Sequence, residues 1–83
     1  MTIEQIEKFL KPTYLNKSRI KISFRKRPSI EGIFIKSTDI SELKNKNFWR
    51  IVSEGRVEAF VKSKSEELAR IFNGSEITRL EVI

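Results

Sequence analysis

Cysteine and histidine are both missing from this 83-residue chain, and their absence limits the chemistry it can perform. Without cysteine no disulfide can form, and without either residue no zinc site of the Cys/His kind is possible. The chain also lacks a positively charged leader followed by an apolar stretch. Together with the lack of cysteine, this favours a reducing compartment, and we expect a cytoplasmic protein.

Most enzymes need groups that are scarce here. General acid-base and nucleophilic catalysis usually require histidine, or a nucleophile with a base beside it. Only three glycines are present, and they do not form a phosphate-binding loop. Asp39 and Glu42 lie close in the sequence, but such a pair is usually only solvated. We therefore expect no enzyme, with no catalytic residues, no metal, no cofactor and no small-molecule substrate.

Long apolar runs are missing too, because no run exceeds three residues, as in Ile33 to Ile35. A helix that spans a membrane needs roughly 20 mostly apolar residues, so we expect no membrane association. The chain is too short for two independent cores, which predicts a single domain over residues 1–83. Its hydrophobic fraction of 39% and charged fraction of 34% fit a small folded domain with a solvated surface.

Acidic residues are absent between Glu7 and Glu31. The excess of basic over acidic residues that gives the chain its net charge of +6 lies in this gap. Its basic residues are Lys8, Lys11, Lys17, Arg19, Lys21, Arg25, Lys26 and Arg27. Such an asymmetry attracts phosphate backbones and other polyanions. The same residues also fit the solvated outer face of a strand in a basic protein, so both interpretations remain open.

The start of the chain has the pattern of a short amphipathic helix. Thr2 and Gln5 form a capping-box pattern, and Pro12 should end the helix by withholding the next hydrogen bond. The apolar stripe between them recurs every three to four residues and consists of Ile3, Ile6, Phe9 and Leu10. A helix with one apolar face must dock on the rest of the domain.

After Arg19 the apolar period changes to two, which predicts strands. We predict strands at 20–25, 30–36, 48–53, 57–61 and 77–83, a loop at 37–47 with one helical turn at 40–43, and a second short helix over about 63–73. Gly32 lies inside the second strand, where a glycine permits a sharp bend or the close approach of another backbone. Asn73 and Gly74 offer a left-handed C-cap for the second helix. The predicted fold is mostly β: a small barrel or a strongly bent sheet.

Two stretches of the chain resemble the motifs of the Sm-like family, which includes Hfq-like proteins. The first is 20–39, where alternating apolar residues precede Gly32 and an acidic residue follows at the loop. The second is 71–80, with Gly74 and the spaced Ile77 and Leu80. Asn73 stands where the family usually has arginine. The Tyr-Lys-His run that Hfq-like proteins use is absent from this chain. The resemblance implies an N-terminal helix followed by a five-stranded SH3-type barrel, with RNA as the ligand.

The resemblance also implies a ring in which the fourth strand of one subunit pairs with the fifth strand of the next. The last strand, Ile77 to Ile83, has an edge with little charge to protect it, which a neighbouring copy would satisfy. The alternative is that the first helix covers this strand within its own domain. We therefore expect either a homo-oligomer through the C-terminal edge strand or a self-contained monomer.

The leading functional hypothesis is RNA binding through the basic segment. Phe48 and Trp49 are adjacent in a predicted strand and so point to opposite faces. Trp49 could therefore stack on a base, or it could lie in the core or a subunit interface. The candidate nucleic-acid-binding residues are Lys17, Arg19, Lys21, Arg25, Lys26, Arg27, Trp49 and Arg50. The alternative is a protein-protein interaction or scaffold domain that binds no nucleic acid and uses its open sheet edge.

Overall fold

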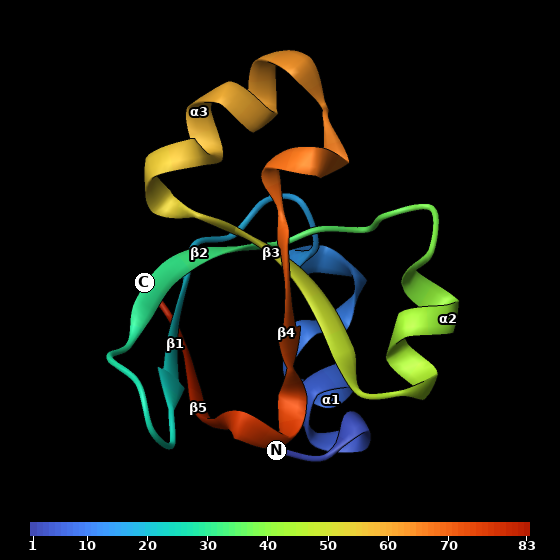
Figure 1. Ribbon diagram of the computed structural model, residues 1–83, viewed down its shortest axis with the longest axis vertical. Helices are drawn as coiled ribbons and strands as arrows, with labels where there is room; N and C mark the ends of the chain where they lie inside the picture. The colour runs from blue at the N-terminus through green and yellow to red at the C-terminus, as the bar shows by residue number, and fades with distance from the viewer.

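The chain folds as a helix followed by a five-stranded antiparallel sheet, with further helices between the strands (Figure 1). The computed structural model describes the backbone of residues 1–83 and all side chains except those of Pro12 and Thr13. The helices are α1 (Ile3–Tyr14), α2 (Ile40–Asn45) and α3 (Glu54–Ser63), with two 3-10 helices, η1 (Glu66–Leu68) and η2 (Gly74–Glu76). The strands are β1 (Ile20–Phe24), β2 (Ile30–Phe34), β3 (Phe48–Ser53), β4 (Arg70–Asn73) and β5 (Ile77–Val82).

The predicted capping box at the start of α1 is confirmed. The Gln5 amide donates to Thr2 Oγ1 over 3.2 Å, and the Thr2 amide donates to Gln5 Oε1 over 2.9 Å. Regular helix geometry is interrupted at Lys11, which has φ 47° and ψ 157°. Pro12, to which the sequence pattern attributed the end of the helix, lies outside the residues whose side chains are described.

The sheet has the strand order β4-β3-β2-β1-β5 and separates two apolar clusters. The larger cluster joins α1 to the sheet and contains Ile6, Leu10, Ile20, Ile22, Phe34, Trp49, Ile51, Ile77 and Leu80. The smaller cluster joins α3 and η1 to the other face of β2 and β3, and contains Ile33, Ile35, Val52, Phe60 and Ala69. Because β2 and β3 are covered on both faces, the sequence from 33 to 35 is continuously apolar rather than alternating.

Gly32 allows the close backbone approach that its place in the strand suggested. A Cβ atom built at this position would lie 2.4 Å from the carbonyl oxygen of Val52 in the neighbouring strand β3. Real Cβ atoms do not come so close to a backbone oxygen, so only glycine fits here without movement of a strand.

Two predicted elements in the second half of the chain are wrong. Residues 57–61 belong to α3 rather than to a strand, because Val57 and Phe60 are three residues apart and both pack on the smaller cluster. The predicted helix over 63–73 is instead η1 followed by β4, in which Ile71 and Phe72 point to opposite sides. As a result 40% of the residues are helical and 32% are in strands, so the expected predominance of β structure is not found.

The sheet is open rather than a closed barrel. β4 pairs only with β3, and β5 pairs only with β1, so over the described backbone these two strands are the edges of the sheet. The 3-10 helix η2 connects them directly, which brings the two edges of the sheet together at one end of the molecule (Figure 1). In the part of the chain that the structure describes, no helix is long and apolar enough to cross a bilayer.

Candidate nucleic-acid interface

The predicted basic residues come from several different elements of the fold. Lys17 and Arg19 lie between α1 and β1, Lys21 lies on the outer face of β1, and Arg25, Lys26 and Arg27 lie in the turn between β1 and β2. Arg50 comes from β3. The eight candidate residues therefore divide into groups with different surroundings, and each group has to be judged by its own neighbours.

Carboxylates balance the cations at the start of β1. Arg19 Nη1 lies 3.1 Å from Glu54 Oε1, in a pair whose side chains are about half exposed. Lys21 lies directly opposite Glu31 on β2 and Glu81 on β5 in the sheet register. Directly opposite residues on one sheet face are close enough to interact, so Lys21 is flanked by two carboxylates, of which Glu81 also pairs with Arg79 over 3.1 Å. Carboxylates therefore partly neutralise Arg19 and Lys21.

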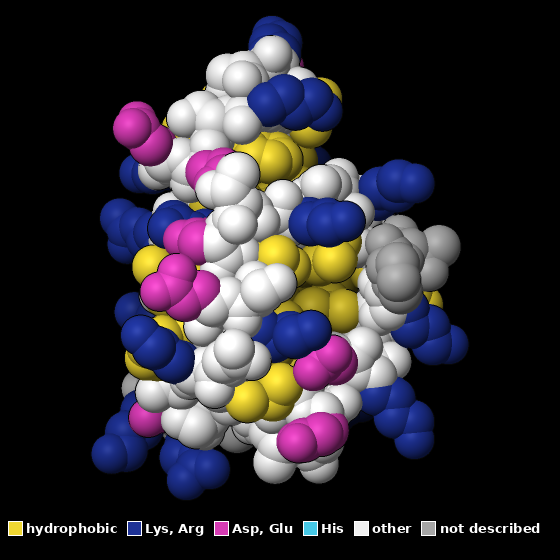
Figure 2. Space-filling model, turned by 90° about the vertical axis from the view of Figure 1, so that its right-hand side faces the viewer, with side chains coloured by type: hydrophobic (Ala, Val, Ile, Leu, Met, Phe, Trp, Pro, Cys, Tyr) yellow, Lys and Arg dark blue, Asp and Glu magenta, His cyan; other side chains and the backbone are white. Residues whose placement is uncertain are grey.

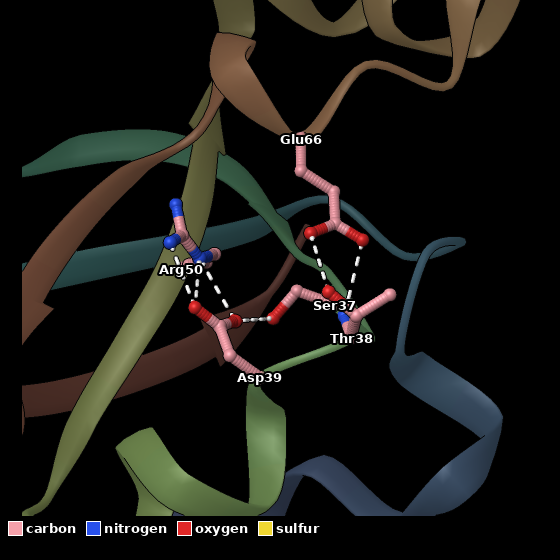
Figure 3. Close-up of polar contacts among 5 residues, drawn as sticks. All are labelled: Ser37, Thr38, Asp39, Arg50 and Glu66. Carbon is pink, nitrogen blue, oxygen red and sulfur yellow. Dashed lines mark hydrogen bonds and ion pairs between the residues drawn. The ribbon is translucent and has the colours of Figure 1, made fainter.

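Arg50 is held by Asp39 in a two-pronged ion pair (Figure 3). Arg50 Nη2 lies 2.8 Å from Asp39 Oδ2, and Nε lies 3.0 Å from Oδ1. Ser37 Oγ donates to the same carboxylate over 2.6 Å. Close by, Glu66 accepts hydrogen bonds from the Thr38 amide and hydroxyl. These contacts fasten the connection between β2 and α2 to β3 and η1, so Arg50 acts here as a structural residue.

The Asp39–Arg50 pair makes stability depend on acid pH. Hydrogen bonds from Arg50 and Ser37 lower the pKa of Asp39 from 3.8 to about 2. A carboxylate whose pKa is lower in the folded state stabilises the fold above its unfolded pKa, and this contribution is lost as the pH falls towards the folded pKa. We expect D39N to lower the thermal midpoint at pH 7, and the difference from wild type to shrink as the pH falls from about 4 to about 2, where half of the folded carboxylates are protonated.

The matched control for D39N is E42Q. Glu42 is an exposed carboxylate in α2 that takes part in no ion pair among the described side chains. Thermal unfolding followed by circular dichroism between pH 2 and pH 7 measures all three proteins. E42Q should remain close to the wild-type midpoint at pH 7. An unchanged D39N midpoint at that pH would show that the pair does not stabilise the fold.

Trp49 cannot stack on a base in this structure, so this part of the predicted site is wrong. Its side chain is 4% exposed and lies in the larger apolar cluster, with its ring 6.1 Å from that of Phe34. Its indole Nε1 donates to Asn47 Oδ1 over 2.8 Å. The alternative of a core tryptophan is the correct one. As expected for adjacent strand residues, Phe48 is directed away from this cluster and is half-buried.

The turn between β1 and β2 is different, because one of its cations, Arg27, lies over an aromatic pair. The rings of Phe24 and Phe72 stack with centroids 5.5 Å apart and an angle of 29° between their planes. The guanidinium of Arg27 lies over both rings, 5.4 Å from the centroid of Phe24 and 5.6 Å from that of Phe72. Such cation-π geometry places a flat charged group on an aromatic surface. Arg25 and Lys26, both exposed, precede Arg27 in the same turn.

Two adjoining hollows open around this aromatic pair, and we call them together the turn cleft. The first has a volume of about 460 Å³ and is lined by Phe24, Lys26, Arg27, Ile71, Phe72, Asn73 and Glu76. The second has a volume of about 630 Å³ and is lined by Arg27, Pro28, Ile30, Ser53, Arg56, Arg70, Ile71 and Phe72. Both hollows share Arg27, Ile71 and Phe72, so the cleft runs between the β1–β2 turn and β4.

The turn cleft contains functional candidates that the linear pattern missed. Arg56 from α3 and Arg70 from β4 lie far from the basic segment in the sequence but line the same cleft. Among the described side chains, neither they nor the turn residues Arg25, Lys26 and Arg27 form an ion pair. In the sequence, only the Arg-Ile-Phe run at 70–72 pointed to these residues. It fits a strand with basic and aromatic side chains, but the segment was predicted to be helical.

The side chains of the turn cleft are suited to bind a flexible polyanion that carries flat groups. Cations that are not neutralised by carboxylates line a cleft whose floor includes a stacked aromatic pair and the exposed side chain of Ile71. Comparison of the chain with known protein families, with curated proteins and with solved structures gave no match, so its function has to be argued from this geometry.

Proposed function

We propose that the chain binds single-stranded RNA in the turn cleft. The observation that carries the proposal is the set of four cations, Lys26, Arg27, Arg56 and Arg70, that line the cleft around the Phe24–Phe72 pair. Cations that contact phosphates supply affinity through the release of counterions, and aromatic rings accept stacked bases. The proposed site keeps Lys26 and Arg27 of the basic segment and leaves out Lys17, Arg19, Lys21, Arg25, Trp49 and Arg50.

We further propose that the open sheet is an Sm-like barrel that lacks closure between β4 and β5. The support is the element order, a helix followed by five antiparallel strands, together with the positions of Gly32 and Gly74. Gly74 is buried, and a Cβ there would lie 2.2 Å from Asn47 Oδ1. The proposal includes assembly through the two free edges, since β4 and β5 each leave one row of backbone groups unpaired in the strand order.

The experiment that tests RNA binding is fluorescence anisotropy with labelled oligouridine at 50 and 200 mM salt. A single strand gives a logarithmic salt slope of about −0.7 for each phosphate contact, so four contacts predict a slope of about −2.8. Affinity should therefore fall by about 50-fold between the two salt concentrations. The absence of binding at 50 mM salt would reject the proposal. Light scattering on the same sample measures the mass and tests assembly.

A protein-binding role is the second candidate, and a different face of the molecule favours it. Figure 2 shows apolar side chains gathered in the middle of the face that carries α2, with Lys and Arg side chains around them. A hollow of about 170 Å³ between α1 and α2 has an apolar lining that includes Leu10, Leu15, Ile40 and Trp49. The salt series separates the two candidates, because this hollow offers a polyanion only Lys11 and Lys44, and Lys44 is paired with Glu7.

A further inference from the structure

We propose that the turn cleft selects guanine among the four RNA bases, and that Glu76 is the residue that recognises it. This inference rests on the proposed RNA-binding function and names the ligand of the same site. The charged residues that line the cleft are of one sign, with a single exception. Glu76 is the one carboxylate that lines the cleft among the described side chains, and all the other charged residues that line it are cations.

A carboxylate is unfavourable in a site that serves only to hold phosphate, because like charges repel. Glu76 does not neutralise its cationic neighbours either, since it forms no ion pair among the described side chains. Its backbone holds the site in place, with the amide of Arg25 donating to the Glu76 carbonyl over 2.9 Å. The side chain is exposed and accepts no hydrogen bond from the described residues, so both its oxygens are available to a ligand that donates.

Arg27 shows what kind of group the aromatic floor accepts. Its guanidinium is planar, delocalised and rich in N–H donors, and it lies over both Phe24 and Phe72. Guanine contains the same arrangement of atoms, because its C2 is bonded to N1, N2 and N3 in a guanidine-like unit that belongs to a flat ring system. A guanine that replaces the Arg27 side chain over these rings keeps the stacking contact and brings donors of the same type into the hollow.

Asn73 supplies the second polar contact of the hollow. Its Oδ1 accepts from the Ser75 amide over 2.9 Å and from the Ser75 hydroxyl over 2.7 Å, which fixes the orientation of the side-chain amide. The oxygen is therefore occupied within η2, and the NH₂ group remains as a donor. The hollow thus presents one carboxylate, which accepts two hydrogen bonds, and one amide, which donates.

Only guanine among the four bases matches this pattern on its Watson–Crick edge. Its N1–H and N2–H₂ groups are adjacent donors that suit the two oxygens of Glu76, and its O6 accepts from the Asn73 amide. Adenine and cytosine each place a ring acceptor beside a single amino group. Uracil has one N–H donor between two carbonyl oxygens. Each of these three bases can give Glu76 one hydrogen bond and then places an acceptor against the carboxylate.

The test measures binding of labelled ten-nucleotide oligouridines that carry a single central guanosine, adenosine or inosine, or no replacement. Wild-type protein should bind the guanosine RNA about tenfold more tightly than the all-uridine RNA, as expected for one two-pronged contact to a base. Inosine lacks the N2 amino group, so its advantage over uridine should be much smaller. E76Q should lose the preference and bind all four RNAs with similar affinity.

The control variant is E67Q, which removes an exposed carboxylate of η1 that lines neither hollow. It should keep the tenfold preference for guanosine. Equal binding of all four RNAs by the wild-type protein would overturn guanine selection and leave RNA binding intact. No binding of any RNA would instead reject the proposed function, and guanine selection with it. Because the inosine comparison uses wild-type protein, the test does not depend on whether E76Q folds.

Discussion

Replacement of Gly32 by alanine is expected to lower the free energy of unfolding by about 2 to 3 kcal/mol, at the upper end of the usual cost of overpacking. The added Cβ would lie 2.4 Å from the Val52 carbonyl oxygen, 3.1 Å from the Val52 carbonyl carbon and 3.2 Å from Ile51 Cγ2. Two of these atoms belong to the backbone of β3, which is fixed between β2 and β4 in the sheet. Relief of the contact therefore requires movement of a strand rather than of a side chain.

The effect should be easy to measure because the domain is small. Cores of this size rarely supply more than about 3 to 5 kcal/mol of net stability, so G32A should leave a substantial unfolded population at 25 °C. Urea unfolding, followed by the fluorescence of the buried Trp49, gives the midpoint and the slope. The slope should stay unchanged if only stability is altered.

Gly55 provides a control of opposite sign. It lies in the first turn of α3, and a Cβ there would meet nothing within 4 Å. Alanine in place of an exposed helical glycine is expected to stabilise the protein by about 0.5 to 1 kcal/mol. If G32A and G55A shifted the urea midpoint alike, the close approach of β2 and β3 at Gly32 could not be the reason for the glycine.

The parts of the fold that the sequence predicted are those in which local pattern and tertiary contact agree. The capping box of Thr2 and Gln5 is a contact between residues three apart, so it does not depend on the rest of the chain. In β1, Ile20 and Ile22 are buried and Lys21 is exposed, as the period of two requires. The strand β3 and the short helix α2 were also placed correctly within one or two residues.

The region from 54 to 73 was misassigned because both of its elements are short and weakly patterned. α3 buries a single residue, Phe60, while Val61 remains 53% exposed, so its apolar positions do not mark a clear helical face. β4 has only four residues and buries none of them fully. Its adjacent apolar residues fit either a helical face or a strand that contacts both sides. Tertiary packing decides between such readings, and a local pattern does not contain that information.

The candidate site was predictable only in part, for a reason that concerns register. The gap in acidic residues drew attention to the β1–β2 turn, where Lys26 and Arg27 line the turn cleft. It could not show that Glu31 and Glu81, both outside the gap, flank Lys21 once three strands are aligned. The gap also could not show that Arg56 and Arg70 lie near the turn, because their positions depend on how α3 and β4 pack in the fold. Linear charge density therefore overestimated one end of the basic segment and overlooked residues across the cleft.

Alanine replacement of Lys26 and Arg27 together is expected to weaken RNA binding by about 70-fold at 50 mM salt and about 10-fold at 200 mM salt. Two lost contacts at about 0.7 each should reduce the logarithmic salt slope by about 1.4. The loss of affinity thus depends on salt, because counterion release at the turn contributes most when the salt concentration is low. Anisotropy titrations with oligouridine across this range measure both the affinity and its slope.

The matched variant replaces Lys8 and Lys46 with alanine. These two exposed lysines line neither hollow and form no ion pair among the described side chains, so the net charge falls by the same amount without any change in the turn cleft. If position rather than total charge decides binding, this variant should keep a salt slope close to that of the wild type. Equal losses in the two double variants would mean that RNA binding depends only on the net charge of +6. The aromatic pair under Arg27 would then have no part in recognition, because a general attraction does not depend on where the rings lie.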